Sequence, residues 1–289
     1  MRVAVLGATG VIGGALVRRL ASTHEVTAVA RRPGDAPGAD WVVADLTAPG
    51  DAQRALAGSD VAVHLVHSLG SADFEDRDRR IATNVARAAE RNGLAQIVYL
   101  GGLGDDSPTL SKHLVSRRDT GRALESGATP VTTLRAGMVV GPGSAAFETI
   151  VALVDRLPAM ICPRWVSVPT QPIALRDAHG YLEGVIGLEA AYGETFDIGG
   201  DEVMTYREMI DRIAKIRGKH PRIVEVPVLT PRLSSWWLHL VTPVKASVAR
   251  PLIDGLRSPT VVRDERIRML VPLELTPFDA AVREALSAR

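Results

Sequence analysis

Three glycines near the start of the chain, Gly7, Gly10 and Gly13, restrict its fold more than any other feature. They follow an apolar run at residues 3–6. They open a segment in which apolar residues recur every four positions: Ile12, Leu16 and Leu20. The pattern predicts a buried strand, a sharp turn and an amphipathic helix. Glycine suits such a turn because it lets the backbone bend sharply, approach a ligand and bring the helix close to the strand.

A turn of this kind, placed directly after a strand, favours a dinucleotide over the alternative of an ordinary tight turn. The free amides and positive dipole end of the helix amino terminus would hold a pyrophosphate. We expect the whole turn to contact the cofactor: Gly7, Ala8, Thr9, Gly10, Val11, Ile12 and Gly13.

Two arginines, Arg31 and Arg32, end the second apolar run, where NAD-binding proteins usually carry an acidic residue. Guanidinium groups suit a 2′-phosphate, so NADP(H) is the preferred cofactor and NAD(H) is possible; alternatively, one or both arginines merely face solvent. Asp45 and Leu46 follow the third run. The Asp45 carboxylate could accept a hydrogen bond from the adenine amino group, or it could cap a helix.

Short apolar runs and helical patterns alternate along the first half of the chain, at residues 3–6, 26–30, 41–44, 61–65 and 97–100. This rhythm predicts an α/β fold with a Rossmann-type doubly wound parallel sheet. Prolines interrupt the alternation after residues 141–143. We expect a dinucleotide-binding domain over residues 1–140, with a strand and a helix returned from later segments, and a smaller substrate region over residues 141–289.

Two helices are predicted in the second half. Thr205 and Glu208 have the spacing of a capping box, and Gly218 would end that helix. The last helix is expected to start at Thr276 and Pro277.

The composition excludes several classes of function. The 34 basic and 33 acidic residues nearly cancel, so nucleic acid is not an expected partner. The single cysteine, Cys162, cannot form an intramolecular disulfide, which fits a reducing compartment. The amino terminus leaves no room for a signal peptide, so a cytoplasmic location is expected.

Several longer stretches resemble the atypical, extended-like short-chain dehydrogenase/reductase family, in the bacterial NAD(P)H-binding branch related to a complex I accessory subunit. They are GATGVIGG, the Asp45–Leu46 pair, HLVHS, Asn84, IVYLGG, LESGATPVTTLRAG, QPIALRDA and ETFDIGGDEVMTYREM. The resemblance implies a nicotinamide cofactor and a small-molecule substrate. Family enzymes reduce carbonyls or epimerise sugars with a Tyr-x-x-x-Lys pair on a helix and a Ser or Thr at the end of strand five.

The catalytic residues of the family are changed in this sequence. None of its 4 tyrosines has a lysine four residues later. The resemblance aligns His113 with the tyrosine, Arg117 with the lysine, and Gly101 or Gly102 with the serine. His113 could donate a proton or, held neutral by Arg117, orient a carbonyl group. Arg117 could bind the nicotinamide ribose.

Three further features remain open to more than one interpretation. His67 and Ser68 follow the fourth strand and are expected to contact the cofactor, chiefly through the backbone, whereas His64 could be a core residue. No metal site is predicted at these histidines, because no carboxylate or cysteine lies nearby at ligand spacing. The charged cluster at residues 74–80 is interpreted as a solvated first helical turn.

Trp236 and Trp237 could line a lipophilic pocket, touch a membrane surface or a quinone, or form a subunit contact; ordinary core packing is the simplest alternative. Two functions are therefore compatible with the sequence. One is an NADP(H)-dependent oxidoreductase of a carbonyl or quinone. The other is a non-catalytic NAD(P)H-binding redox sensor or assembly factor.

Overall fold

A seven-stranded sheet forms the centre of the computed structural model, which describes residues 1–68, 71, 73–104, 111–226 and 258–288. Its strand order is β11-β6-β5-β4-β1-β2-β3, and all neighbouring strands pair in parallel. The strands are β1 (Arg2–Leu6), β2 (Glu25–Ala30), β3 (Ala39–Val43), β4 (Val61–His64), β5 (Gln96–Gly102), β6 (Val131–Ala136) and β11 (Thr195–Ile198). The predicted Rossmann-type α/β fold is confirmed.

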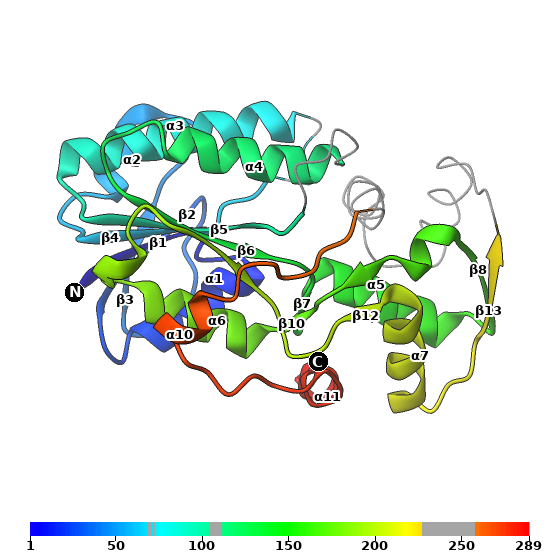
Figure 1. The fold of residues 1–289 in the computed structure, drawn as a ribbon. Coiled ribbons are helices and arrows are strands. Elements are labelled where there is room, and N and C mark those ends of the chain that lie inside the picture. The colour runs from blue at the N-terminus through cyan, green and yellow to red at the C-terminus, as the bar shows by residue number, and fades with distance from the viewer. Residues whose placement is uncertain (69–70, 72, 105–110, 227–257, 289) are drawn as a thin grey trace.

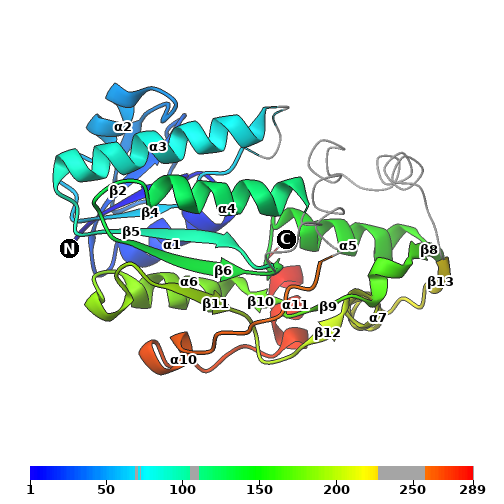
Figure 2. The same cartoon turned by 45° about the horizontal axis from the view of Figure 1, so that its top comes forward.

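Helices cover both faces of this sheet (Figures 1 and 2). One face carries α2 (Pro49–Ala55), α3 (Phe74–Asn92) and α4 (Lys112–Leu124), and the other carries α1 (Val11–Leu20), α6 (Leu175–Val185) and α10 (Ile267–Leu270). The alternation of β1 explains the two layers: Val3 and Val5 join the core under α1, whereas Ala4 and Leu6 join the core under α3.

The later part of the chain builds a second core beside the sheet (Figure 1). Its helices are α5 (Ala145–Arg156), α7 (Tyr206–Ile216) and α11 (Phe278–Ser287), with the 3₁₀ turn η1 (Arg164–Ser167). Two-stranded pairs join it: β7 (Val139–Val140) with β10 (Ile173–Ala174), β9 (Pro169–Thr170) with β12 (Met204–Thr205), and β8 (Ala159–Pro163) with β13 (Arg222–Val226). Since α6, the 3₁₀ turn η2 (Glu189–Ala191), β11 and α10 return to the large sheet, residues beyond 141 contribute to both cores.

Local signals in the second half are confirmed by the structure. The Thr205 hydroxyl accepts from the Glu208 amide at 3.2 Å, and the Glu208 carboxylate accepts from the Thr205 amide at 2.7 Å. Gly218 follows the end of α7 with a φ of +65°. The last helix begins at Phe278, directly after the expected Thr276–Pro277 start.

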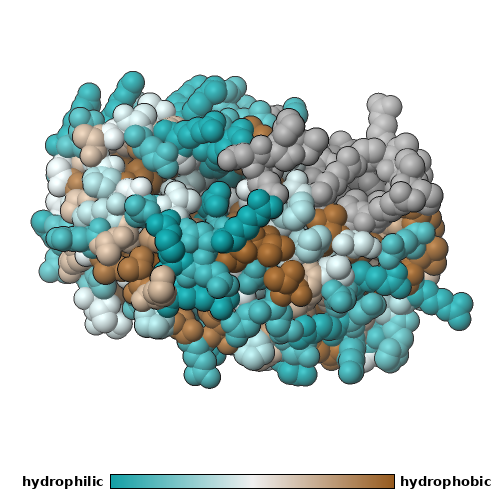
Figure 3. Space-filling model, viewed as in Figure 1, coloured by the Kyte–Doolittle hydropathy of each residue, from teal (hydrophilic) through white to brown (hydrophobic). Residues whose placement is uncertain are grey.

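The surface is mixed in character. Figure 3 shows a largely polar face with apolar patches, one of them at the end of the molecule where β8 and β13 leave Ile161 and Val224 exposed. Within the described ranges, no helix combines the length and apolar character needed to cross a bilayer. Trp236 and Trp237 lie outside the described residues, so their interpretation stays a prediction.

Candidate functional site

The glycine turn is built by close packing between β1, β2 and α1. Gly7 has a φ of +90°, and its amide and that of Ala8 donate to the Val29 carbonyl at 3.0 and 3.1 Å. A Cβ at Gly13 would lie 2.3 Å from the Gly7 oxygen, so only glycine lets α1 pack this close. Gly10, the N-cap of α1, has ordinary dihedrals, and its Cβ would meet only the Gly7 oxygen, at 3.2 Å. Gly7 and Gly13 are therefore structural, whereas Gly10 leaves space for a ligand.

A groove of about 250 Å³ opens beside this turn, across the carboxyl ends of β1, β2 and β4. Among its lining residues are Gly7, Thr9, Gly10, Arg31, Asp45, Leu46, His67, Ser68 and Arg77. Parallel sheets bind dinucleotides where the strand order reverses, here between β1 and β4. The first turn of α1 contains no acidic residue and no side-chain cap, so its amide donors suit a phosphate. The groove thus fits a dinucleotide.

The two arginines after β2 lie at the edge of this groove. Arg31 lines both the groove and a neighbouring hollow, which it shares with Thr9, Arg32 and Pro33. Both guanidinium-bearing residues are exposed. A phosphate bound in this hollow would therefore meet two cations close to the turn that binds the pyrophosphate.

Asp45 lines the groove but does not cap α2, whose N-cap is Ala48. Its carboxylate accepts from the amide and hydroxyl of Thr47 at 3.1 and 2.9 Å, and these bonds lower the pKa of Asp45. The backbone of the next residue, Leu46, is bonded to α3, because the Asn84 side-chain amide donates to the Leu46 carbonyl at 3.0 Å. The loop that would face the adenine is thus fixed by hydrogen bonds at both Asp45 and Leu46.

His67 forms a pair with a carboxylate from α3. Its Nδ1 lies 2.9 Å from Asp78 Oδ2, while Asp78 Oδ1 accepts from the Ser68 amide at 2.9 Å. Asp78 is only 2% exposed, so the interpretation of residues 74–80 as a wholly solvated turn is wrong at this position. Burial alone would raise the pKa of Asp78, but the bonds from His67 and Ser68 lower it, which keeps the carboxylate charged.

A signal for Asp78 is visible in hindsight. Phe74, Asp78, Ile81 and Val85 recur at helical spacing and are all buried on one side of α3. The apolar members of this stripe mark the inward face, and Asp78 is the acidic residue among them. A carboxylate on such a face needs a partner.

His113 and His67 face one another, with ring centroids 5.1 Å apart. The Nδ1 atom of His113 is buried and has no hydrogen-bond partner among the described residues. Burial first, and then the neighbouring His67 and Arg117, lower the pKa of His113 to about 3. Arg117 therefore acts in the expected direction but is not the main cause, and His113 is neutral near pH 7.

Arg117, one turn along α4, is turned towards β5. Its guanidinium donates to the Leu100 carbonyl and stacks 4.9 Å from the centre of the Tyr99 ring. Its Nη1 atom is buried without a partner in the described part of the chain. One nitrogen is thus used to fix the side chain, and another is left for a ligand.

Both side chains line an apolar cavity of about 320 Å³ that adjoins the groove. Leu65 and His67 border both spaces. The remaining lining is mainly aliphatic and includes Ile12, Leu100, Leu103, Leu114, Met138 and Val139. A Cβ at Gly102 would come 2.9 Å from Leu114 Cδ2, so Leu114 fills the space that a serine would need there.

His64 is a core residue, as one interpretation of the sequence held. It is 1% exposed, its Nδ1 has no partner among the described residues, and burial is the first cause that lowers its pKa to about 3. Three or more metal-ligating side chains do not gather anywhere in the described ranges.

This burial predicts a pH effect on stability. The unfolded chain binds a proton at His64 below about pH 6.5, whereas the folded chain does so only near pH 3, so the free energy of unfolding falls as pH falls through this window. The slope of the unfolding free energy against pH should therefore be smaller in His64→Leu, by up to about 1.4 kcal/mol per pH unit. Urea unfolding between pH 6 and 4 measures this slope. An unchanged slope would contradict the burial of a neutral imidazole; above pH 7 the slopes of both proteins should coincide.

Comparison with known proteins agrees with this geometry. Residues 7–139 match the profile of a family described as NAD(P)H-binding. Ceramide reductase of Caulobacter vibrioides is 25% identical over 313 aligned positions, which cover 99% of this chain and 89% of that protein. Both matches agree with the resemblance to the atypical short-chain dehydrogenases/reductases. The family match over residues 7–139 supports NAD(P)H binding by this chain.

Other relatives are more distant or only partly matched. The complex I subunit 9 of Arabidopsis thaliana is 22% identical over 239 residues, 77% of this chain and 60% of that protein. An uncharacterized protein of Mycobacterium tuberculosis is 38% identical over 102 residues, but the match spans only 12% of its length and 34% of this chain.

Solved structures share the fold along nearly the whole chain. A nucleoside-diphosphate-sugar epimerase of Staphylococcus aureus has a TM-score of 0.78 at 17% identity, covering 98% of this chain and 100% of that one. The triphenylmethane reductase of Citrobacter sp., in complex with NADP(H), has a TM-score of 0.76 at 19% identity, with coverage of 99% and 100%. At these identities the likeness concerns the fold.

Proposed function

We propose that this chain is an NADPH-dependent reductase of a carbonyl or quinone group in a lipophilic molecule. The observation that carries the proposal is the apolar cavity that adjoins the dinucleotide groove and shares Leu65 and His67 with it. A cavity of this lining favours an apolar substrate. The relative in Caulobacter vibrioides named ceramide reductase, which aligns along nearly the whole chain, supports a lipid-like substrate.

The residues of the groove fit a dinucleotide. In the proposal, residues 7–13 hold the pyrophosphate, Asp45 and Leu46 face the adenine, and His67 and Ser68 border the ribose. Arg117, which lines the cavity next to the groove, would lie beside the nicotinamide ribose. When bound, the reduced nicotinamide supplies a hydride to the carbonyl carbon.

The preference for NADPH rests on the hollow beside Thr9, Arg31 and Arg32. We expect Arg31→Gln to weaken NADPH binding about 10- to 100-fold, the loss of one charge-assisted contact to a phosphate, and to leave NADH binding unchanged. Calorimetry with both nucleotides measures the difference. Arg87→Gln, the same change at an exposed site on α3, is the control. Equal losses for NADPH and NADH would contradict a 2′-phosphate contact.

In this proposal two histidines act on the substrate oxygen: His113 donates a hydrogen bond to it, and His67 donates a proton. His113 is neutral, so one of its ring nitrogens carries a hydrogen that can bond to the carbonyl oxygen and stabilise the charge that develops there. His67 is oriented by Asp78 and can donate the proton that completes the alcohol, because the carboxylate stabilises its protonated form. Together they take over the role of the missing tyrosine.

A second candidate function is a redox sensor or assembly factor that binds NAD(P)H without turnover. The replacement of the family's catalytic set by His113, Arg117 and the Gly101–Gly102 pair favours it. The match to the Arabidopsis complex I subunit also supports it. Turnover of NADPH with a panel of long-chain ketones and quinones separates the two functions. Tight NADPH binding with no turnover on any member of the panel would support the sensor.

A further inference from the structure

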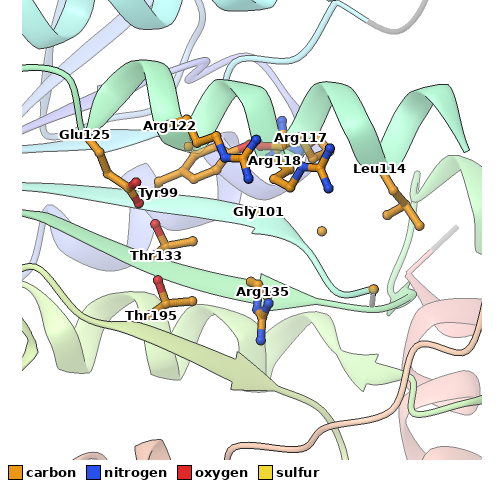
Figure 4. Close-up of a pocket in the computed structure, with 13 residues that line it drawn as sticks. Tyr99, Gly101, Leu114, Arg117, Arg118, Arg122, Glu125, Thr133, Arg135 and Thr195 are labelled. Atoms are coloured by element: carbon orange, nitrogen blue, oxygen red, sulfur yellow. The ribbon is translucent and has the colours of Figure 1, made fainter. Parts of the chain in front are cut away.

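A second cavity, of about 210 Å³, lies between α4 and the strands β5, β6 and β11 (Figure 4). None of its described lining residues also lines the dinucleotide groove. Its wall towards the substrate cavity is the Gly101–Gly102 pair with Leu114 and Arg117, which line both spaces. The reductase mechanism leaves this cavity without a role.

Four arginines line this cavity. Arg117, Arg118 and Arg122 project from α4, and Arg135 comes from β6 (Figure 4). Among the described residues, Glu125 is the one carboxylate in the same lining. The described lining therefore carries more positive than negative side chains.

Two further carboxylates of the described residues, Asp197 and Asp119, lie near these arginines. Asp197 accepts from Arg135 Nε at 2.7 Å. Asp119 lies 3.9 Å from Arg118 Nε and also 3.9 Å from Arg122 Nη1, which is too long for a hydrogen bond.

Two buried polar atoms in the lining are left without partners. Arg117 Nη1 and Thr133 Oγ1 have no hydrogen-bond partner among the described residues, and their residues are only 8% and 6% exposed. A buried donor without a partner destabilises the folded state. Both atoms belong to side chains that line the same cavity, and a ligand with several acceptor oxygens would satisfy them.

Arg117 is held in position before any ligand arrives. The Tyr99 hydroxyl donates to the Arg117 carbonyl at 2.7 Å, and the Arg117 guanidinium bonds to the Leu100 carbonyl. Since the Arg117 side chain is already ordered, a ligand would lose little binding free energy in ordering it.

We propose that this cavity is a binding site for a small oxyanion, namely a phosphate group. Its oxygens accept from Arg117 Nη1, from the Thr133 hydroxyl and from the guanidinium of Arg122. Planar guanidinium donors match the geometry of phosphate oxygens. Glu125 weakens the site by repulsion.

Inorganic phosphate is the probe for this site, followed by amide NMR shifts at constant ionic strength. Saturable shifts are expected at Gly101, Gly102 and Thr133. Arg122→Gln should weaken this binding about tenfold, the loss of one contact to a charged group. Glu125→Gln should strengthen it. Shifts confined to the cofactor groove, or an affinity unchanged in both variants, would overturn the proposal.

Two further variants separate this site from misfolding and from the cofactor groove. Thr133→Val keeps the shape of a side chain whose hydroxyl has no partner among the described residues, so it should fold normally and still weaken phosphate binding. Arg31→Gln should alter only the shifts at the glycine turn. The titration needs no turnover and no NADPH, so it can fail while the proposed reductase stands, and the reverse also holds.

Discussion

Replacing Gly10 with leucine is expected to abolish cofactor binding while the protein stays folded. The position accepts a side chain, since its dihedrals are those of an ordinary N-cap and its Cβ would meet only the Gly7 oxygen, at 3.2 Å. The leucine side chain would occupy the path of the pyrophosphate. We expect NADPH affinity to fall by about 100-fold or more and the free energy of unfolding to change by about 1 kcal/mol, measured by calorimetry and urea unfolding.

Gly13→Ala is the contrasting variant for this prediction. Its Cβ would lie 2.3 Å from the Gly7 oxygen, so the backbone of the turn must shift. We expect a loss of about 2 to 4 kcal/mol in stability. If Gly10→Leu bound NADPH as tightly as the wild type, the turn would not be the pyrophosphate site, and the proposed function would fail with it.

Loss of either histidine is expected to reduce turnover strongly. We expect His113→Ala to lower kcat by about 100-fold, because it removes a hydrogen bond to the developing alkoxide. His67→Ala should lower kcat by about 100-fold or more, because it removes the proton donor. NADPH oxidation with the best substrate of the ketone and quinone panel measures both, and NADPH affinity serves as the control. Turnover unaffected by His113→Ala would remove that residue from the mechanism.

The pH profile tests the same mechanism without removing a histidine. Burial lowers the pKa of His67, and the bond to Asp78 opposes this shift. Since the proton donor must be protonated, kcat should fall as pH rises through a pKa below 6.5. Asp78→Asn takes away the stabilising charge, so the fall should move to lower pH. A profile that is identical in both proteins would exclude the His67–Asp78 pair as proton donor.

The central sheet could be predicted from the sequence because its signals are local. The glycine spacing at residues 7–13, the alternation of apolar runs and the Thr205–Glu208 capping box each arise within one element or between two neighbours. Short-range sterics and burial determine these features, whereas the strand order was seen only in the structure. The same reasoning indicated a dinucleotide groove and the two arginines beside it.

The partners and protonation states of the site residues could not be predicted from the sequence in the same way. Spacing relates residues within an element, whereas Asp78 meets His67 only because α3 packs on the sheet after β4. The neutrality of His113 comes chiefly from burial, which no neighbour in the sequence reports. Likewise, the arginine-lined cavity exists because α4 stands over β6 and β11. The sequence by itself thus determined the fold and the place of the cofactor turn, while the tertiary structure decided which side chains lose water and gain partners, since desolvation depends on contacts between distant segments.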